Sequence, residues 1–146
     1  MHKNQKMKKI FILLIVFIFS ITFFACKQTE EDLRWQEILT NKKWETVGTD
    51  KKRVAWMPIF EFNEKNRGKS YLHLQSANKD AFGWEVRRKE MRLYYDKAPM
   101  EYQIGQDQYN SKALFRVRSA NDSLVEVTHL SKAGYETDYT LRKIIE

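Results

Sequence analysis

A run of apolar and small residues near the N-terminus constrains this chain more than any other feature. The run extends for sixteen residues from Ile10 to Ala25, follows four lysines and ends at Cys26, the only cysteine of the 146-residue chain. A basic start, an apolar centre and a small residue before the cut are the parts of a secretory signal peptide. The run is shorter than the roughly 20 residues that span a membrane. We therefore predict a cleaved signal peptide over residues 1–25, with an uncleaved signal anchor as the alternative.

The last residues of the run, together with Cys26, form a second motif. The segment Phe23-Phe24-Ala25-Cys26 resembles the lipobox of bacterial lipoproteins, in the relaxed form of the Bacteroidetes group. This resemblance implies that Cys26 is lipidated, with palmitate-like acyl chains, and becomes the first residue of the mature protein. It also implies firm attachment, because a single acyl chain binds a membrane only weakly. The location that follows is the cell envelope, lipid-anchored, with the outer membrane favoured, on its periplasmic side or at the cell surface.

Removing the signal changes the charge balance of the chain. Four of the 26 lysines and arginines lie in residues 1–25, so the remainder carries 22 basic against 19 acidic residues. Its net charge is +3 rather than +7, which argues against a nucleic-acid partner. The sequence has no phosphate loop, no zinc-binding H-E-x-x-H motif, no nucleophile elbow and no calcium loop. His73 and His129 are far apart in the sequence, so we expect no cofactor, no metal site and no enzymatic activity.

A short helix is predicted after the cysteine. We assign residues 26–32 to the lipidated Cys26 and a short tether, and residues 33–146 to one folded domain. Within this region Thr29 precedes three acidic residues, a pattern close to a capping box, and acids in the first turn favour a helix. Trp35, Ile38 and Leu39 then share one face at helical spacing. These signals predict a helix over about residues 30–40 that packs on the domain.

From Trp44 onward the apolar period changes to two, which indicates strands. Because no helical pattern separates them, the strands form an antiparallel meander of about eight. Closing the meander into a barrel removes exposed edges, and a β-sandwich is the alternative. Gly83 is a candidate bulge. The alternating positions include Phe60 and Phe62, Leu72 and Leu74, Phe82 and Trp84, Met91 and Leu93, Tyr102 and Ile104, Phe115 and Val117, Val125 and Val127, and Tyr139 and Leu141.

Three segments carry a resemblance to a known family. They are Leu39-Thr-Asn-Lys-Lys-Trp44, Phe60-Glu-Phe62 and Tyr139-Thr-Leu-Arg-Lys-Ile144. Together they resemble the lipocalin-like domains of bacterial lipoproteins, over about residues 33–145. The resemblance implies a mainly β fold, in which the eight strands close into a lipocalin-like barrel. It also implies that Trp44 closes one end of the core, with Arg142 or Lys143 packed over its indole as a cation–π pair.

The function of such a barrel depends on whether its interior has room for a ligand. Eight strands enclose a space just wide enough for side chains or one small ligand. We expect a monomer with a narrow or nearly filled interior that binds a small apolar ligand next to the membrane. The alternative is an inhibitor, immunity or assembly factor that acts through its surface. An enzyme would need an inward cluster of His73 or His129 with carboxylates. The candidate barrel-lining residues are Phe60, Phe62, Phe82, Trp84, Tyr102, Phe115 and Tyr139.

Overall fold

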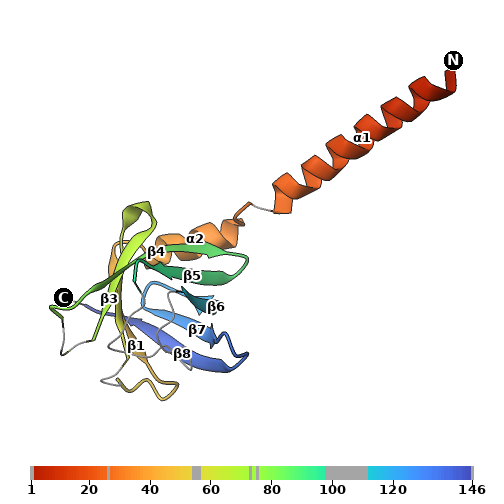
Figure 1. Ribbon diagram of the computed structural model, residues 1–146. Helices are drawn as coiled ribbons and strands as arrows, with labels where there is room; N and C mark the ends of the chain where they lie inside the picture. The colour runs from red at the N-terminus through yellow and green to blue at the C-terminus, as the bar shows by residue number, and fades with distance from the viewer. Residues whose placement is uncertain are drawn as a thin grey trace.

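Eight antiparallel strands form a closed barrel in sequential order (Figure 1). This computed structural model describes residues 2–25, 27–53, 57–72, 74, 76–97 and 112–145. Each strand pairs with the next, and β8 returns to pair with β1, which confirms the predicted barrel over the sandwich. The elements are α1 (His2–Ala25), α2 (Glu30–Leu39), β1 (Lys42–Val47), β2 (Ile59–Phe62), the 3₁₀ turn η1 (Glu64–Asn66), β3 (Arg67–Tyr71), β4 (Asp80–Arg87), β5 (Glu90–Tyr95), β6 (Lys112–Ala120), β7 (Leu124–Leu130) and β8 (Glu136–Lys143).

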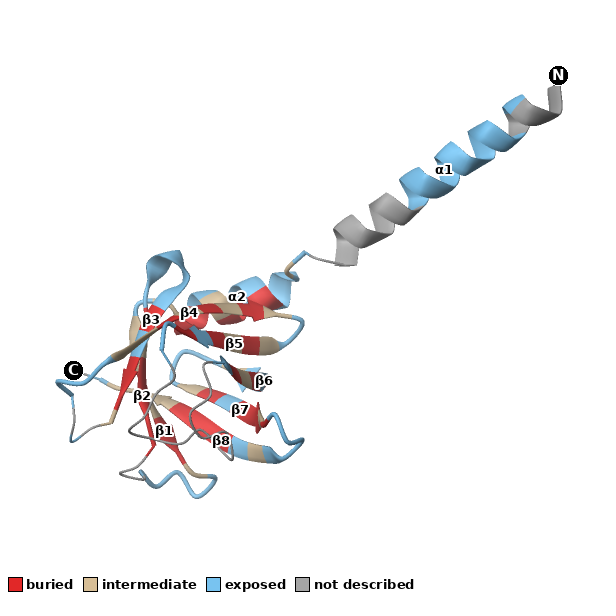
Figure 2. Ribbon diagram, in the orientation of Figure 1, coloured by how far each residue is buried: buried red, intermediate tan, exposed pale blue. Residues whose placement is uncertain are grey.

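The alternation of apolar and polar residues gives the strands an inward-facing and an outward-facing side. Along β4, for example, Phe82, Trp84 and Val86 are buried while the residues between them are partly exposed. Strands β5 and β6 alternate in the same way, whereas β7 and β8 each contain a run of three buried residues. Figure 2 shows buried residues along the strands of the barrel wall. Successive side chains of a strand point to opposite faces, so the alternating apolar residues of β4, β5 and β6 face the barrel interior. The core therefore lies inside the barrel.

Helix α2 covers one end of this barrel. The Thr29 hydroxyl accepts the Asp32 N–H at 3.1 Å, and the Asp32 carboxylate accepts the Thr29 N–H at 3.0 Å, which confirms the predicted capping box. The same carboxylate accepts the N–H groups of Arg88 and Lys89, in the β4–β5 turn, at 3.0 and 2.9 Å. One buried side chain thus both starts the helix and fastens it to the barrel.

The ionisation of Asp32 follows from these contacts. Burial raises the pKa of the carboxyl, but the backbone N–H groups of Lys89, Thr29 and Arg88 stabilise its charged form more strongly. The net effect holds the pKa of Asp32 below its usual value. We call the end that α2 covers, together with the β2–β3, β4–β5 and β6–β7 turns, the closed end. The opposite end, where β1, β3, β5 and β7 end, is the mouth.

The folded domain begins earlier than the predicted boundary at residue 33. The Gln28 amide donates hydrogen bonds to the Val86 carbonyl at 2.6 Å and to the Gln36 side chain at 2.8 Å. The helix itself starts at Glu30, as predicted, and so lies partly within the segment assigned to the tether. Lys27 is thus the one residue between Cys26, which lies outside the described residues, and a side chain bonded to the barrel.

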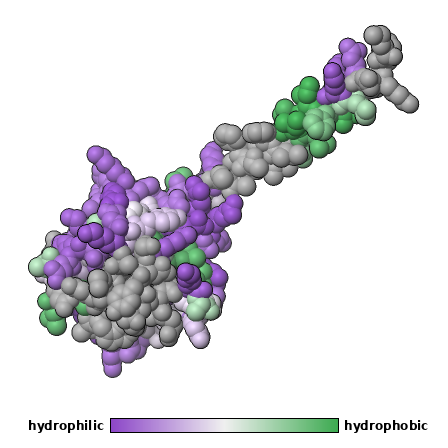
Figure 3. Space-filling model, viewed as in Figure 1, coloured by the Kyte–Doolittle hydropathy of each residue, from purple (hydrophilic) through white to green (hydrophobic). Residues whose placement is uncertain are grey.

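Helix α1 extends away from the closed end (Figure 1). Its central side chains are exposed and apolar, including Phe11, Leu13 and Phe17, and Figure 3 shows this apolar stretch beside a mostly hydrophilic barrel surface. In the part of the chain that the structure describes, no helix combines the length and apolar content needed to cross a membrane.

Two local expectations for the strands are wrong. Strand β3 ends at Tyr71, so Leu72 and Leu74 do not continue the alternating set, and Leu74 is 83 % exposed. The inward residues of β3 are Gly68 and Ser70, which carry no apolar signal in the sequence. Gly83 is not a bulge, because it pairs regularly on both sides. The register shift lies instead in β6, between Val117 and Ser119.

Candidate functional site

The interior at the closed end is filled with contacting aromatic rings. Phe62 lies 4.7 Å from Trp84 and 5.7 Å from Phe82, measured between ring centroids. Phe60 lies 6.2 Å from both Phe82 and Phe115, which carries the cluster across the middle of the barrel. Edge-to-face and offset pairs at these distances stabilise each other beyond their burial. Five of the predicted lining residues therefore meet, and they pack against one another rather than around an open space.

Trp44 completes the closed end. Its side chain is fully buried, and its indole N–H donates to the Leu39 carbonyl at the end of α2, at 3.2 Å. This is the structural role that the sequence indicates. Of the two expected cation–π partners, Arg142 is wrong, because it pairs with Glu45, at 2.7 Å, on the outer face, whereas Lys143 pairs with Trp44 in the β1–β8 register. Neighbouring residues of a strand face opposite sides, so Arg142 does not lie over the indole of the inward Trp44.

The mouth half of the interior is more polar and combines small side chains with the rings of Tyr95 and Tyr139. Ser70 is fully buried and its hydroxyl is 2.9 Å from the Tyr95 hydroxyl. Ala113 is inward and 3 % exposed, and the Thr46 hydroxyl donates to the Pro58 carbonyl at 2.8 Å. Tyr139 is buried on β8 and pairs with Val127. Among the described residues, the inward groups near the mouth are therefore more polar than the aromatic rings of the closed end.

His129 also belongs to this half. Its side chain is fully buried and lies 5.1 Å from the Phe115 ring. The reason is its register, since His129 pairs with Phe115 on the inner face. Sequence patterning marks it only weakly, as the third position of the alternating set in β7. Among the described residues, no three His, Cys, Asp or Glu side chains gather as a metal site would require.

Two predicted site positions lie outside the described residues. These are Tyr102, a candidate lining residue, and Cys26, the predicted lipidation site. His73 is also outside them.

A cleft of about 380 Å³ lies on the outside of the closed end. Its lining is polar and consists of Asn41, Lys42, Lys43, Glu61, Asn63, Lys143 and Ile144. Burial raises the pKa of Glu61, but hydrogen bonds from Tyr71 and Lys79 outweigh this and leave it below its usual value. Such a charged cleft does not suit an apolar ligand, so the interior remains the better candidate site.

Comparison with solved structures agrees with the barrel. The chain is similar to a lipocalin-like protein from Bacteroides uniformis, with a TM-score of 0.51 and 15% sequence identity, over 73% of this chain and 99% of that one. The fold is lipocalin-like. At this identity the likeness concerns the fold alone. No protein-family model matches the sequence, and no curated protein is significantly similar to it.

Proposed function

We propose that this protein is a non-enzymatic, monomeric lipoprotein of the cell envelope that binds a small apolar ligand in the mouth half of its lipocalin-like barrel. The observation that carries this proposal is the contrast inside the barrel. Aromatic rings fill the closed half, whereas the inward positions Ser70 and Ala113 of the mouth half hold small side chains. An eight-stranded barrel of this kind accommodates one small ligand.

The lining suggests the chemistry of the ligand. An apolar body would contact the inner faces of Phe60 and Phe115, and a single polar group would reach the hydroxyls of Ser70 and Tyr95. Mostly apolar walls with a few placed polar groups are typical of small-molecule sites. The filled closed half restricts the ligand to a short molecule.

Anchoring through Cys26 is the other part of the proposal. It is supported by the lipobox-like Phe23-Phe24-Ala25-Cys26 and the lysines before the apolar run. Cys26→Ala should abolish incorporation of labelled palmitate, whereas Lys27→Ala should leave it intact. Incorporation into the Cys26→Ala variant would contradict the anchor.

Native mass spectrometry of the full chain, purified in detergent from its host, tests ligand binding. We expect a co-purifying mass of lipid size or smaller. Ala113→Leu places a larger side chain in the mouth half and should remove that mass. The matched control is Ala133→Leu in the exposed β7–β8 turn, which should retain it. Consistent absence of any added mass in the wild type would contradict ligand binding.

A surface role in protein interaction is the second candidate, and the ring contacts favour it. Because Phe60, Phe62, Phe82, Trp84 and Phe115 pack together, much of the interior is occupied by the protein itself. A ligand-free barrel whose Ala113→Leu variant unfolds more easily would favour this second function.

A further inference from the structure

The attachment of α2 places the predicted anchor against one particular part of the barrel. Gln28 is bonded to the β4 carbonyl of Val86 at 2.6 Å, and Asp32 holds the two N–H groups of the β4–β5 turn. Only Lys27 separates Gln28 from Cys26. One residue spans about 3.5 Å, so a lipid on Cys26 would hold the closed end at the membrane surface. The mouth would then face away from the lipid.

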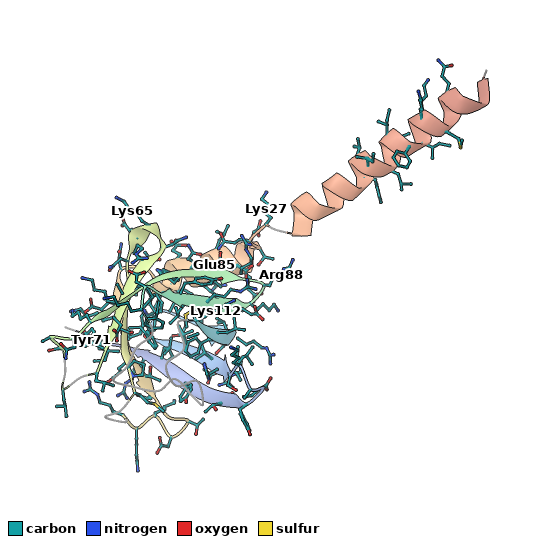
Figure 4. The ribbon with its side chains drawn as sticks, in the orientation of Figure 1. Lys27, Lys65, Tyr71, Glu85, Arg88 and Lys112 are labelled. Atoms are coloured by element: carbon teal, nitrogen blue, oxygen red, sulfur yellow. The ribbon has the colours of Figure 1, made fainter. Side chains whose placement is uncertain are left out.

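Exposed basic and acidic side chains both surround this end, with Glu37 and Glu64 among the acidic ones. Lys27, Lys65, Arg88 and Lys89 are exposed, and Figure 4 shows the first three around the end of the barrel that α2 covers. The β2–β3 turn that carries Lys65 is joined to α2 by a hydrogen bond of 2.9 Å between the Gln36 and Asn66 side chains. Glu30 and Glu31 lie in the first turn of α2, and Glu31 is 3.6 Å from Lys89.

The backbone of these turns gives an independent reason to assign a role to the charges. Arg88 and Lys89 form a two-residue turn with φ of 53° and 62°, and Lys65 has φ of 63°. Left-handed backbone is unfavourable for long side chains, and Asn-Gly is the preferred pair for such a hairpin. Non-glycine residues in left-handed conformations are often found where function requires their side chains.

We propose that Lys27, Lys65, Arg88 and Lys89 form a surface that contacts anionic phospholipid headgroups and sets the barrel upright on the membrane, with its mouth directed away from the lipid. The surface rests on the proposed anchor, because the anchor brings the closed end to the bilayer. Anionic lipid attracts lysine and arginine near the surface, and salt screens that attraction. The surface thereby keeps the mouth open to ligands from the surrounding compartment.

Site-directed fluorescence tests the orientation. Because Cys26 is the only cysteine, a label can be attached to Asn63→Cys at the closed end or to Ala133→Cys at the mouth. The full acylated chain is reconstituted into vesicles of phosphatidylcholine, with or without phosphatidylglycerol, that carry a headgroup quencher. With phosphatidylglycerol at 0.1 M salt, we expect the closed-end label to be quenched about threefold more than the mouth label. The difference should shrink at 1 M salt.

A double substitution in the β4–β5 turn distinguishes a loss of lipid contact from a loss of folding. Arg88→Asn with Lys89→Gly removes two charges and installs the pair that the turn prefers, so the unfolding temperature should stay equal or rise. The quenching difference should nevertheless fall towards zero. The control Lys52→Gln with Lys132→Gln removes two charges near the mouth and should keep the difference.

The possible failures are distinguishable by flotation of the vesicles. Wild-type protein that does not float with its vesicles would overturn the anchor and, with it, this surface. Protein that floats but shows equal quenching of both labels would overturn only the surface. If the variant with Arg88→Asn and Lys89→Gly keeps the quenching difference between the two labels, the β4–β5 turn is not part of the lipid-contacting surface.

Discussion

The closed half and the mouth half of the barrel are built from the same strands but from different residues. Towards α2 the inward positions hold Trp44, Phe62 and Trp84, whose rings touch their neighbours or the helix. Towards the mouth they hold Ser70 and Ala113. Dense aromatic packing makes a rigid core, because a close-packed interior tolerates little change of volume. The comparison indicates that the aromatic packing is densest at one end of this barrel, and the proposed ligand site lies at the other end.

Among the substitutions that test this comparison, Trp44→Ala should lower the free energy of unfolding most. Truncating a buried aromatic residue leaves a cavity, and the indole bond to Leu39 is lost as well. We expect the free energy of unfolding to fall by about 3–5 kcal/mol. Urea denaturation followed by circular dichroism measures it, with Trp44→Phe as the milder control. An unchanged midpoint would mean that Trp44 does not hold α2 on the barrel.

Gly68→Ala tests how tightly the closed half is packed. An added Cβ at Gly68 would lie 2.4 Å from the Phe82 ring and 2.7 Å from the Glu61 carbonyl. We expect a loss of about 1–3 kcal/mol from overpacking. Gly83→Ala is the matched control on the outer face, where the nearest atom is 3.6 Å away, and it should change stability little. Equal effects of the two substitutions would contradict a filled closed half.

Asp32→Asn weakens the link between α2 and the β4–β5 turn. We expect a loss of about 1–2 kcal/mol at neutral pH, since a helix cap and charge-assisted hydrogen bonds are weakened. The pKa of Asp32 is depressed in the folded protein, so its stabilisation is fully present above the unfolded pKa of about 3.9. It is lost as pH falls below that value and through the folded pKa. The gap between the melting temperatures of the two proteins should therefore stay constant from neutral pH down to about pH 4 and shrink only as the pH falls further, through the folded pKa of Asp32. A gap that does not shrink in acid would contradict this role.

Ion pairs on the outer face of the barrel should contribute least to the free energy of unfolding. Glu45 and Arg142 form a partly exposed ion pair of 2.7 Å, for which a coupling of about 0.2–1 kcal/mol is typical. A double-mutant cycle with Glu45→Gln and Arg142→Gln measures this coupling. The matching cycle between Trp44→Phe and Arg142→Gln should give a value near zero. A larger coupling to Trp44 than to Glu45 would restore the cation–π arrangement.

The sequence predicts the barrel well because its strongest signals are local. Alternation of apolar residues in β4, β5 and β7 depends only on the period of a strand, and the capping box at Thr29 and Asp32 depends on four residues. The ring cluster is likewise visible as inward aromatic positions. The absence of a helical pattern between strands was enough to indicate the meander.

Register is what the sequence does not determine. A shift of one residue moves a side chain to the other face of a sheet, and this decides that Arg142 meets Glu45 instead of Trp44. The inward residues of β3 are Gly68 and Ser70, so β3 lacks the apolar alternation that would have marked its limits. The burial of His129 depends on its register, which pairs it with Phe115 on the neighbouring strand β6.

The most direct test of the contrast between the two halves is the stability of Ala113→Leu measured beside Gly68→Ala. If the mouth half has room for a ligand, the leucine should be accommodated, and the free energy of unfolding of Ala113→Leu should stay within about 0.5 kcal/mol of the wild type. Gly68→Ala should lose about 1–3 kcal/mol in the same experiment. An equal loss in both variants would contradict the account, because it would mean that the mouth half is packed as tightly as the closed half.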